Sequence, residues 1–184
     1  MIPYDDLANF FRNYMEQLSL SVDEIADVTE AAAHLAAETI VNENKLIVCG
    51  VGTDAPNASL LAELLQQGLY RERPAIPVVE LTSRHIVSLD PGVGWLSQQI
   101  TALGQPGDLT FLFATSLNQV DLDFLASALQ KRGLDSIWIG AQGPGASLSF
   151  PGTDRATALA LSQNCAICLA RLVDMTLFGP LEDM

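Results

Sequence analysis

Two short loops hold the residues whose types could bind an anion. The first, residues 49–54, contains Gly50, Gly52, Thr53 and Asp54. Its glycines would let backbone N–H groups approach an anion where the chain enters a helix. A tight strand-to-helix turn also needs glycine for conformational reasons, so an anion site and a simple turn are equally compatible with this loop.

The second loop, residues 114–119, offers two hydroxyl groups and an amide. Thr115 and Ser116 supply the hydroxyls, and Asn118 either contacts a ligand or caps the helix that follows. Capping is the favoured interpretation for Asn118, because asparagine is among the preferred N-cap residues.

Few side chains could transfer a proton near these loops. The sequence has two histidines, His34 in an alanine-rich helical segment and His85 after a predicted strand. His34 is interpreted as a packing or interface residue, and His85 as the best-placed titratable candidate, although a solvated loop histidine is the simpler interpretation.

Arg71 and Arg73 either hold a phosphate across a dimer or form an exposed charged turn, and the turn is favoured.

The three cysteines do not form a metal site. Cys165 and Cys168 have CxxC spacing but lie in an apolar helical stretch without a second pair, and Cys49 lies apart from them. All three are predicted to be small core residues. No metal and no cofactor is predicted.

After residue 44 the sequence has the pattern of a parallel sheet covered on both faces, with short apolar runs between helical segments. We predict strands at 45–49, 76–81, 109–114 and 136–139, with a weaker fifth at 147–150. Predicted helices cover 57–67, Val93–Leu103, Gln119–Arg132 and 154–178. In such a sheet the ligand site lies at the carboxyl ends of strands where the strand order reverses.

The N-terminal region is predicted to form two helices. Residues 4–19 have apolar side chains at helical spacing, and Ser21 with Glu24 fits a capping box that starts a second helix ending near 42–44. Their wide apolar faces indicate packing against a partner subunit. The chain is predicted to be one domain, 1–184, with N-terminal dimerisation helices (1–44), a parallel-sheet core (45–153) and a C-terminal helix (154–184).

Composition excludes several classes of protein. Of 184 residues 49% are hydrophobic, too many for a disordered chain, and the formal net charge of -13 disfavours direct binding to nucleic acid or to anionic membranes. The N-terminus carries acids where a secretory signal carries basic residues, so a cytoplasmic protein is expected.

The two loops and their surroundings resemble the sugar isomerase (SIS) family, in particular the sedoheptulose 7-phosphate (phosphoheptose) isomerases. The segment LIVCGVGTDAPNASLLAELLQQGLYRERP resembles a block with a CGNGGS-type loop, and Gly107-Asp108 with residues 114–119 resembles a GD plus STSGNS block. The resemblance implies a three-layer α/β/α fold with a five-stranded parallel, flavodoxin-like sheet and additional N-terminal helices. It also implies a homodimer or homotetramer and a phosphosugar or nucleotide-sugar ligand.

Several positions depart from the family pattern in the loops. Asp54 matches a phosphate-binding serine, and its carboxylate is expected to accept the free N–H groups at the helix start and so fill the anion site. In the second loop Leu117 and Gln119 replace a glycine and a serine, whereas Thr115 and Ser116 remain.

The catalytic positions also depart from that pattern. Leu60 and Leu64 match the family's metal-binding histidine and catalytic glutamate, with Glu63 as a displaced acid. Gln163 matches a family glutamine, but Arg171 stands where the family has a catalytic histidine. Isomerisation needs an acid–base pair, which these residues do not supply.

Three hypotheses remain. The chain is a non-catalytic SIS protein that works through its oligomer surface, similar to the branch with the DnaA initiator-associating factor, and such a protein would have a protein partner. Alternatively, it senses a sugar derivative, or it is an isomerase that uses Glu63 and His85. The first two are favoured. The candidate ligand-binding residues are Gly50, Gly52, Thr53, Asp54, Thr115, Ser116, Asn118 and Gln163.

Overall fold

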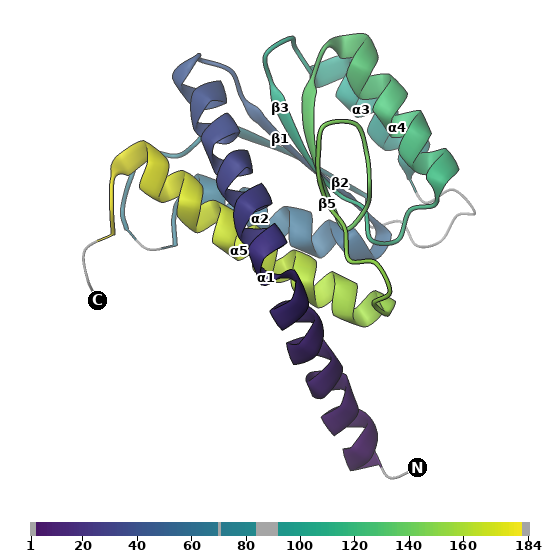
Figure 1. The fold of residues 1–184 in the computed structure, drawn as a ribbon. Coiled ribbons are helices and arrows are strands. Elements are labelled where there is room, and N and C mark those ends of the chain that lie inside the picture. The colour runs from purple at the N-terminus through teal and green to yellow at the C-terminus, as the bar shows by residue number, and fades with distance from the viewer. Residues whose placement is uncertain (1–2, 70, 84–91, 182–184) are drawn as a thin grey trace.

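The computed structural model describes residues 3–69, 71–83 and 92–181 (Figure 1). Most predicted elements are present, with ends that shift by up to two residues. Strand β1 is longer than predicted. It continues to Val51, so Gly50 lies in the strand and not in the first loop. In chain order the elements are α1 (Pro3–Val41), β1 (Leu46–Val51), the 3-10 turn η1 (Gly52–Asp54), α2 (Ala55–Gln67), β2 (Val78–Ser83), α3 (Val93–Leu103), β3 (Leu109–Phe113), α4 (Gln119–Arg132), β4 (Asp135–Ile139), β5 (Ala146–Leu148) and α5 (Arg155–Phe178).

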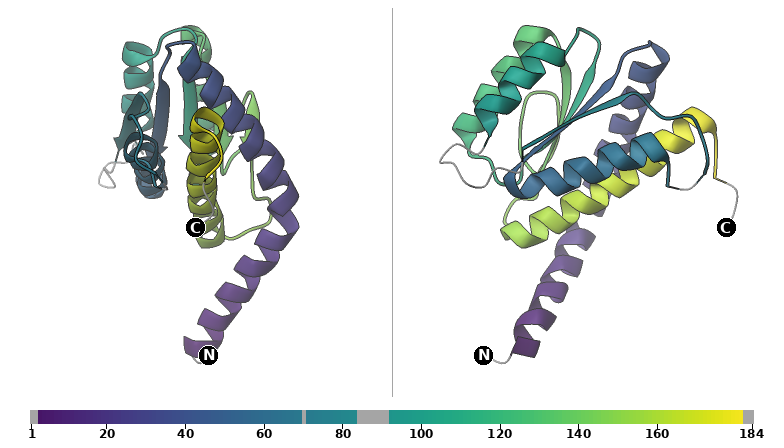
Figure 2. Two further views of the ribbon diagram at one scale, coloured as in Figure 1. Left: turned by 90° about the vertical axis from the view of Figure 1, so that its left-hand side faces the viewer. Right: turned by 180° about the vertical axis from the view of Figure 1, so that it is seen from behind.

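All five strands pair in parallel in the order β2-β1-β3-β4-β5, which confirms the flavodoxin-like sheet. Alternate residues of each strand face opposite sides. On β1, Leu46 and Val48 pack in the cluster beneath α1, α2 and α5, whereas Ile47 and Cys49 pack in the cluster beneath α3 and α4. The sheet is therefore the middle of three layers (Figures 1 and 2).

The N-terminal region forms one helix and not the predicted two. Helix α1 is continuous over 39 residues. Ser21 lies inside it and therefore is not the N-cap of a second helix. The sequence around Ser21 contains no glycine or proline, and the apolar spacing continues through Leu18 and Ile25, which pack against the core. Extending an existing helix is easier than starting a new one, so the capping signal does not break it.

The first half of α1 projects beyond the rest of the molecule (Figures 1 and 2). Its exposed apolar side chains recur at helical spacing, as Tyr4, Leu7, Phe11 and Met15. Within the part of the chain that the structure describes, nothing covers this apolar stripe.

The turn before β2 is not the exposed charged turn that the sequence favours. The Arg73 side chain is 2% exposed and donates to the carboxylate of Asp174 on α5. Arg71 pairs with the same carboxylate, with Nε 3.0 Å from Oδ2, and donates to the carbonyl oxygens of Phe178 and Gly179. The two arginines therefore fix the turn to the end of α5.

Helix α5 has the length and apolar composition of a membrane-spanning helix, but it is a helix of the core. Its side chains Leu161, Leu169 and Val173 are buried against α1, α2 and the sheet. The apolar composition therefore follows from packing inside the domain.

The cysteines are only partly as predicted, since Cys49 and Cys165 are buried and Cys168 is exposed. Burial raises the pKa of the Cys49 thiol, and it raises that of Cys165 to about 12. Because the thiolate is the reactive form, we expect one thiol per chain to react with Ellman's reagent in the native state and all three in denaturant. Native modification of two or more thiols would contradict this burial.

Candidate functional site: a cradle closed by Asp54

The two candidate loops meet at the carboxyl ends of neighbouring strands. Gly52–Asp54 follows β1, and Thr115 with Ser116 follows β3, and the strand order reverses between these two strands. This is the position at which parallel α/β sheets bind ligands. The structure therefore brings together the two loops that the sequence indicated, and ligand binding between them stays a prediction.

The Asp54 carboxylate occupies the space between the loops. Its Oδ1 accepts hydrogen bonds from the Thr115 backbone N–H at 3.2 Å and hydroxyl at 2.6 Å. Its Oδ2 accepts from the Ser116 backbone N–H at 3.1 Å and hydroxyl at 2.6 Å. Asp54 is fully buried. We call the four donor groups of Thr115 and Ser116 the cradle, and the carboxylate fills it.

The expected contact of Asp54 with the start of α2 is wrong. Asp54 is the N-cap residue of α2, but its side chain accepts no hydrogen bond from that helix. Its backbone is helical, with φ -84° and ψ -16°, whereas a side-chain cap normally needs an extended N-cap residue. The carboxylate instead reaches across to the β3 loop, where two hydroxyls and two amides are available.

Two glycines allow this close packing. A Cβ on Gly50 would lie 2.7 Å from the Asp54 carbonyl oxygen and 2.8 Å from the Ala58 Cβ. A Cβ on Gly140, after β4, would lie 2.4 Å from the Thr115 Cγ2. Gly50 brings the start of α2 against β1, and Gly140 lets β4 approach the back of the cradle.

The remaining candidate ligand residues lie outside the cradle. Asn118 caps α4, because its Oδ1 accepts from the Asp121 N–H at 3.1 Å, as the capping interpretation predicts. Thr53 is exposed, and its hydroxyl accepts from Arg155 Nη2 at 2.9 Å. Gln163 is exposed on α5.

Arg155 is a residue that sequence reasoning missed. It begins α5, just after Asp154, whose carboxylate caps that helix through the N–H groups of Ala156 and Thr157. The Thr157 hydroxyl, 2.6 Å from that carboxylate, lowers the pKa of Asp154. No spacing in the sequence indicates that Arg155 reaches the first loop, because the two are far apart along the chain.

The catalytic candidates lie outside the cradle. Glu63 is exposed on α2 about 13 Å further along the helix axis than Asp54, and its side chain accepts from Gln67. Leu64 packs against the core and Arg171 is exposed on α5. His85 lies outside the described residues. Within the described residues no cluster of three or more His, Cys, Asp or Glu side chains could hold a metal.

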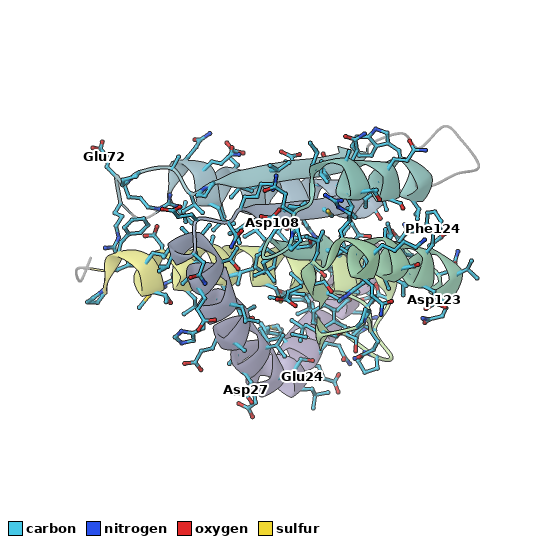
Figure 3. The ribbon with its side chains drawn as sticks, turned by 90° about the horizontal axis from the view of Figure 1, so that it is seen from above. Glu24, Asp27, Glu72, Asp108, Asp123 and Phe124 are labelled. Atoms are coloured by element: carbon cyan, nitrogen blue, oxygen red, sulfur yellow. The ribbon has the colours of Figure 1, made fainter. Side chains whose placement is uncertain are left out.

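Asp108, from the GD pair, has a structural role at the other end of the sheet. Its carboxylate accepts from the Lys45 N–H at 3.0 Å, the Lys45 ammonium at 2.5 Å and the Gln105 N–H at 2.8 Å. Figure 3 shows it within the molecule, just before β3. This part of the resemblance therefore reflects the fold and not the site.

The chain is similar in sequence to two kinds of known protein. No protein-family model matches it. It is 29% identical over 168 residues to a phosphoheptose isomerase of Chromohalobacter salexigens, covering 83% of this chain and 85% of that protein. It is 24% identical to the DnaA initiator-associating protein DiaA of Yersinia enterocolitica, covering 97% and 99%.

A solved structure of a phosphoheptose isomerase from Francisella tularensis superposes with a TM-score of 0.81 at 19% identity, covering 95% of this chain and 100% of that one. The fold is therefore that of the SIS domain, with a five-stranded parallel sheet between helical layers and a long N-terminal helix. In sequence, the chain is similar to phosphoheptose isomerases and to DiaA.

Proposed function

We propose that this chain is a non-catalytic, cytoplasmic SIS protein, a single domain whose sugar-phosphate cradle is closed by its own Asp54. It acts through the surfaces of its assembly, in the manner of a regulatory or scaffold protein. The observation that carries the proposal is the set of four hydrogen bonds from Thr115 and Ser116 to the buried Asp54 carboxylate.

A carboxylate in the cradle opposes phosphate binding in two ways. It uses the donors that a phosphate would need, and its charge repels the phosphate. Two unit charges about 4 Å apart repel by on the order of 4 kcal/mol at an effective dielectric constant of 20. A sugar phosphate would therefore have to displace Asp54 from four hydrogen bonds before it gained any contact.

The side chains at the family's catalytic positions support the absence of turnover. Leu64 has no titratable group, and arginine at position 171 does not act as a base. Glu63, exposed on α2, offers one carboxylate, and the group that donates to it is the neutral amide of Gln67, which is neither an acid nor a base. A proton transfer between neighbouring sugar carbons needs both an acid and a base.

A thermal-shift titration with sedoheptulose 7-phosphate tests the proposal. The wild-type chain is expected to show no shift, whereas Asp54→Ser removes the charge and frees the cradle donors. Ligand at a hundred times its dissociation constant would then stabilise D54S by about 2.7 kcal/mol. D27S, which removes an exposed acid on α1, is the matched control and is expected to behave as wild type.

Either of two results would contradict the closed cradle. A shift of the wild-type protein would mean that Asp54 leaves the cradle, and it would justify an isomerase assay. No shift of D54S, while that variant remains folded, would mean that the carboxylate is not what blocks the site.

The assembly we propose is a homodimer, or a homotetramer made from it, in which a second copy covers the apolar stripe of Tyr4, Leu7, Phe11 and Met15. Exposed apolar surface of this extent on a projecting helix is typical of an interface. We expect L7S/F11S to lower the mass measured by sedimentation equilibrium, because it removes two apolar anchors. N13S, on the same segment, should leave the mass unchanged. A monomeric wild-type chain would refute this assembly.

A further inference from the structure

A groove runs along α4 beside the connection between β4 and β5. It consists of two adjoining hollows of about 530 and about 260 Å³. They share Asp123, Ala126 and Pro144, so they form one continuous depression. The larger hollow alone has the size of a site that holds a small ligand or several side chains.

The wall opposite α4 is rigid. The Pro144 carbonyl oxygen accepts hydrogen bonds from the Trp138 indole N–H and the Ser136 hydroxyl, both at 3.0 Å. Gly143 lies against the Trp138 ring, where a Cβ would come within 2.2 Å of a ring atom. Ser147 fixes the same loop through the backbone of Gly143. A preformed wall lowers the entropy cost of binding.

The rim of the groove combines negative charge with apolar surface. Asp123 and Asp135 are exposed carboxylates in the lining, and the Gln119 amide donates to Asp123 Oδ1 at 2.8 Å and orients it. The apolar part of the lining is formed by Ala126, Leu129, Leu134 and Pro144. Phe124 does not line the groove, and Figure 3 shows it on a different side of α4 from Asp123.

We propose that this groove binds an extended segment of a partner protein in which Lys or Arg side chains alternate with apolar ones. The cations would pair with Asp123 and Asp135, and the apolar side chains would pack on the apolar lining formed by Ala126, Leu129, Leu134 and Pro144. The proposal does not depend on the state of the Asp54 cradle.

Charge complementarity argues against a second copy as the occupant. The chain carries 9 Lys and Arg against 22 Asp and Glu. Several of these cations are engaged within the chain, with Arg71 and Arg73 bound to Asp174 and Arg132 bound to the Gly104 carbonyl. A partner of opposite charge fits the groove better than another acidic copy.

Fluorescence anisotropy with a labelled short peptide of alternating leucine and lysine tests the proposal at physiological salt, against the wild-type chain, D123K and D27K. The two variants change the net charge equally, but only Asp123 lines the groove. We expect D123K to weaken binding about tenfold and D27K to weaken it less than about twofold. A peptide with glutamate in place of lysine is expected not to bind.

A second variant and a second peptide separate groove binding from attraction to an acidic surface. A126Q should weaken binding of the leucine–lysine peptide severalfold without changing any charge, because a longer side chain at a position that lines both hollows fills the groove. Serine in place of the peptide's leucines should have a similar effect. Equal weakening by D123K and D27K, or no effect of A126Q, would overturn the proposal. Absence of binding to the folded wild-type chain would overturn it as well.

Discussion

Asp54→Asn is expected to lower the free energy of unfolding by about 2 kcal/mol, because an amide cannot accept all four hydrogen bonds of the cradle. The amide oxygen can still accept from Thr115, but the amide NH₂ would face the backbone N–H of Ser116. That N–H is then left without an acceptor in a site where residue 54 is fully buried. Urea denaturation, with the m-value compared between the proteins, measures the change.

The matched control is Asp27→Asn, which makes the same chemical change at an exposed position of α1. Surface substitutions of this kind usually alter stability by less than about 0.5 kcal/mol. If D54N and D27N had the same stability, the Asp54 carboxylate would not hold the two loops together. A stability loss in D54N together with anion binding by D54S would support both roles of the carboxylate.

Asp174→Leu is expected to have the largest effect of a single substitution, a loss of about 3–5 kcal/mol, because it leaves the Arg73 guanidinium buried without its counter-charge. The Arg73 side chain is 2% exposed and that of Asp174 is 3% exposed. Arg73 also donates to the carbonyl oxygens of Leu64 and Pro74 and lies over the Phe178 ring, so it cannot easily turn towards water.

A double-mutant cycle separates the lost ion pair from the lost packing. Replacing both partners, as in R73M/D174L, removes the unpaired charge and is expected to recover most of the stability lost in D174L. The free energies of unfolding of the four proteins can be measured by denaturant titration. Additive effects of the two substitutions would contradict a coupled buried pair.

The buried ion pair of Arg73 and Asp174 also changes the interpretation of the turn that contains Arg71 and Arg73. From the sequence, two arginines that flank Glu72 before a proline are typical of a solvated charged turn or of a phosphate contact across a dimer. In the structure both arginines contact Asp174 on α5, which lies 101 residues after Arg73 in the sequence. We therefore expect substitutions of Arg73 to act first on stability and only secondarily on any ligand.

The sequence by itself determined the three-layer architecture, and it placed the two candidate loops at the carboxyl ends of strands. Apolar runs of strand length between amphipathic segments are local patterns, and in a doubly wound sheet they place the loops after β1 and β3 side by side. The cap at Asn118 was equally predictable, because capping depends on residues within one turn. The resemblance to the SIS family added the expectation that these loops form an anion site.

Only the tertiary structure decided which groups the key side chains contact. Asp54 could cap its own helix or reach another loop, and the choice depends on the distance to Thr115 and Ser116, which no local pattern contains. The same holds for Arg155 beside Thr53 and for Arg73 beside Asp174. Local propensities set the elements, but a buried charge takes its partner from whichever distant segment the fold brings within hydrogen-bonding distance.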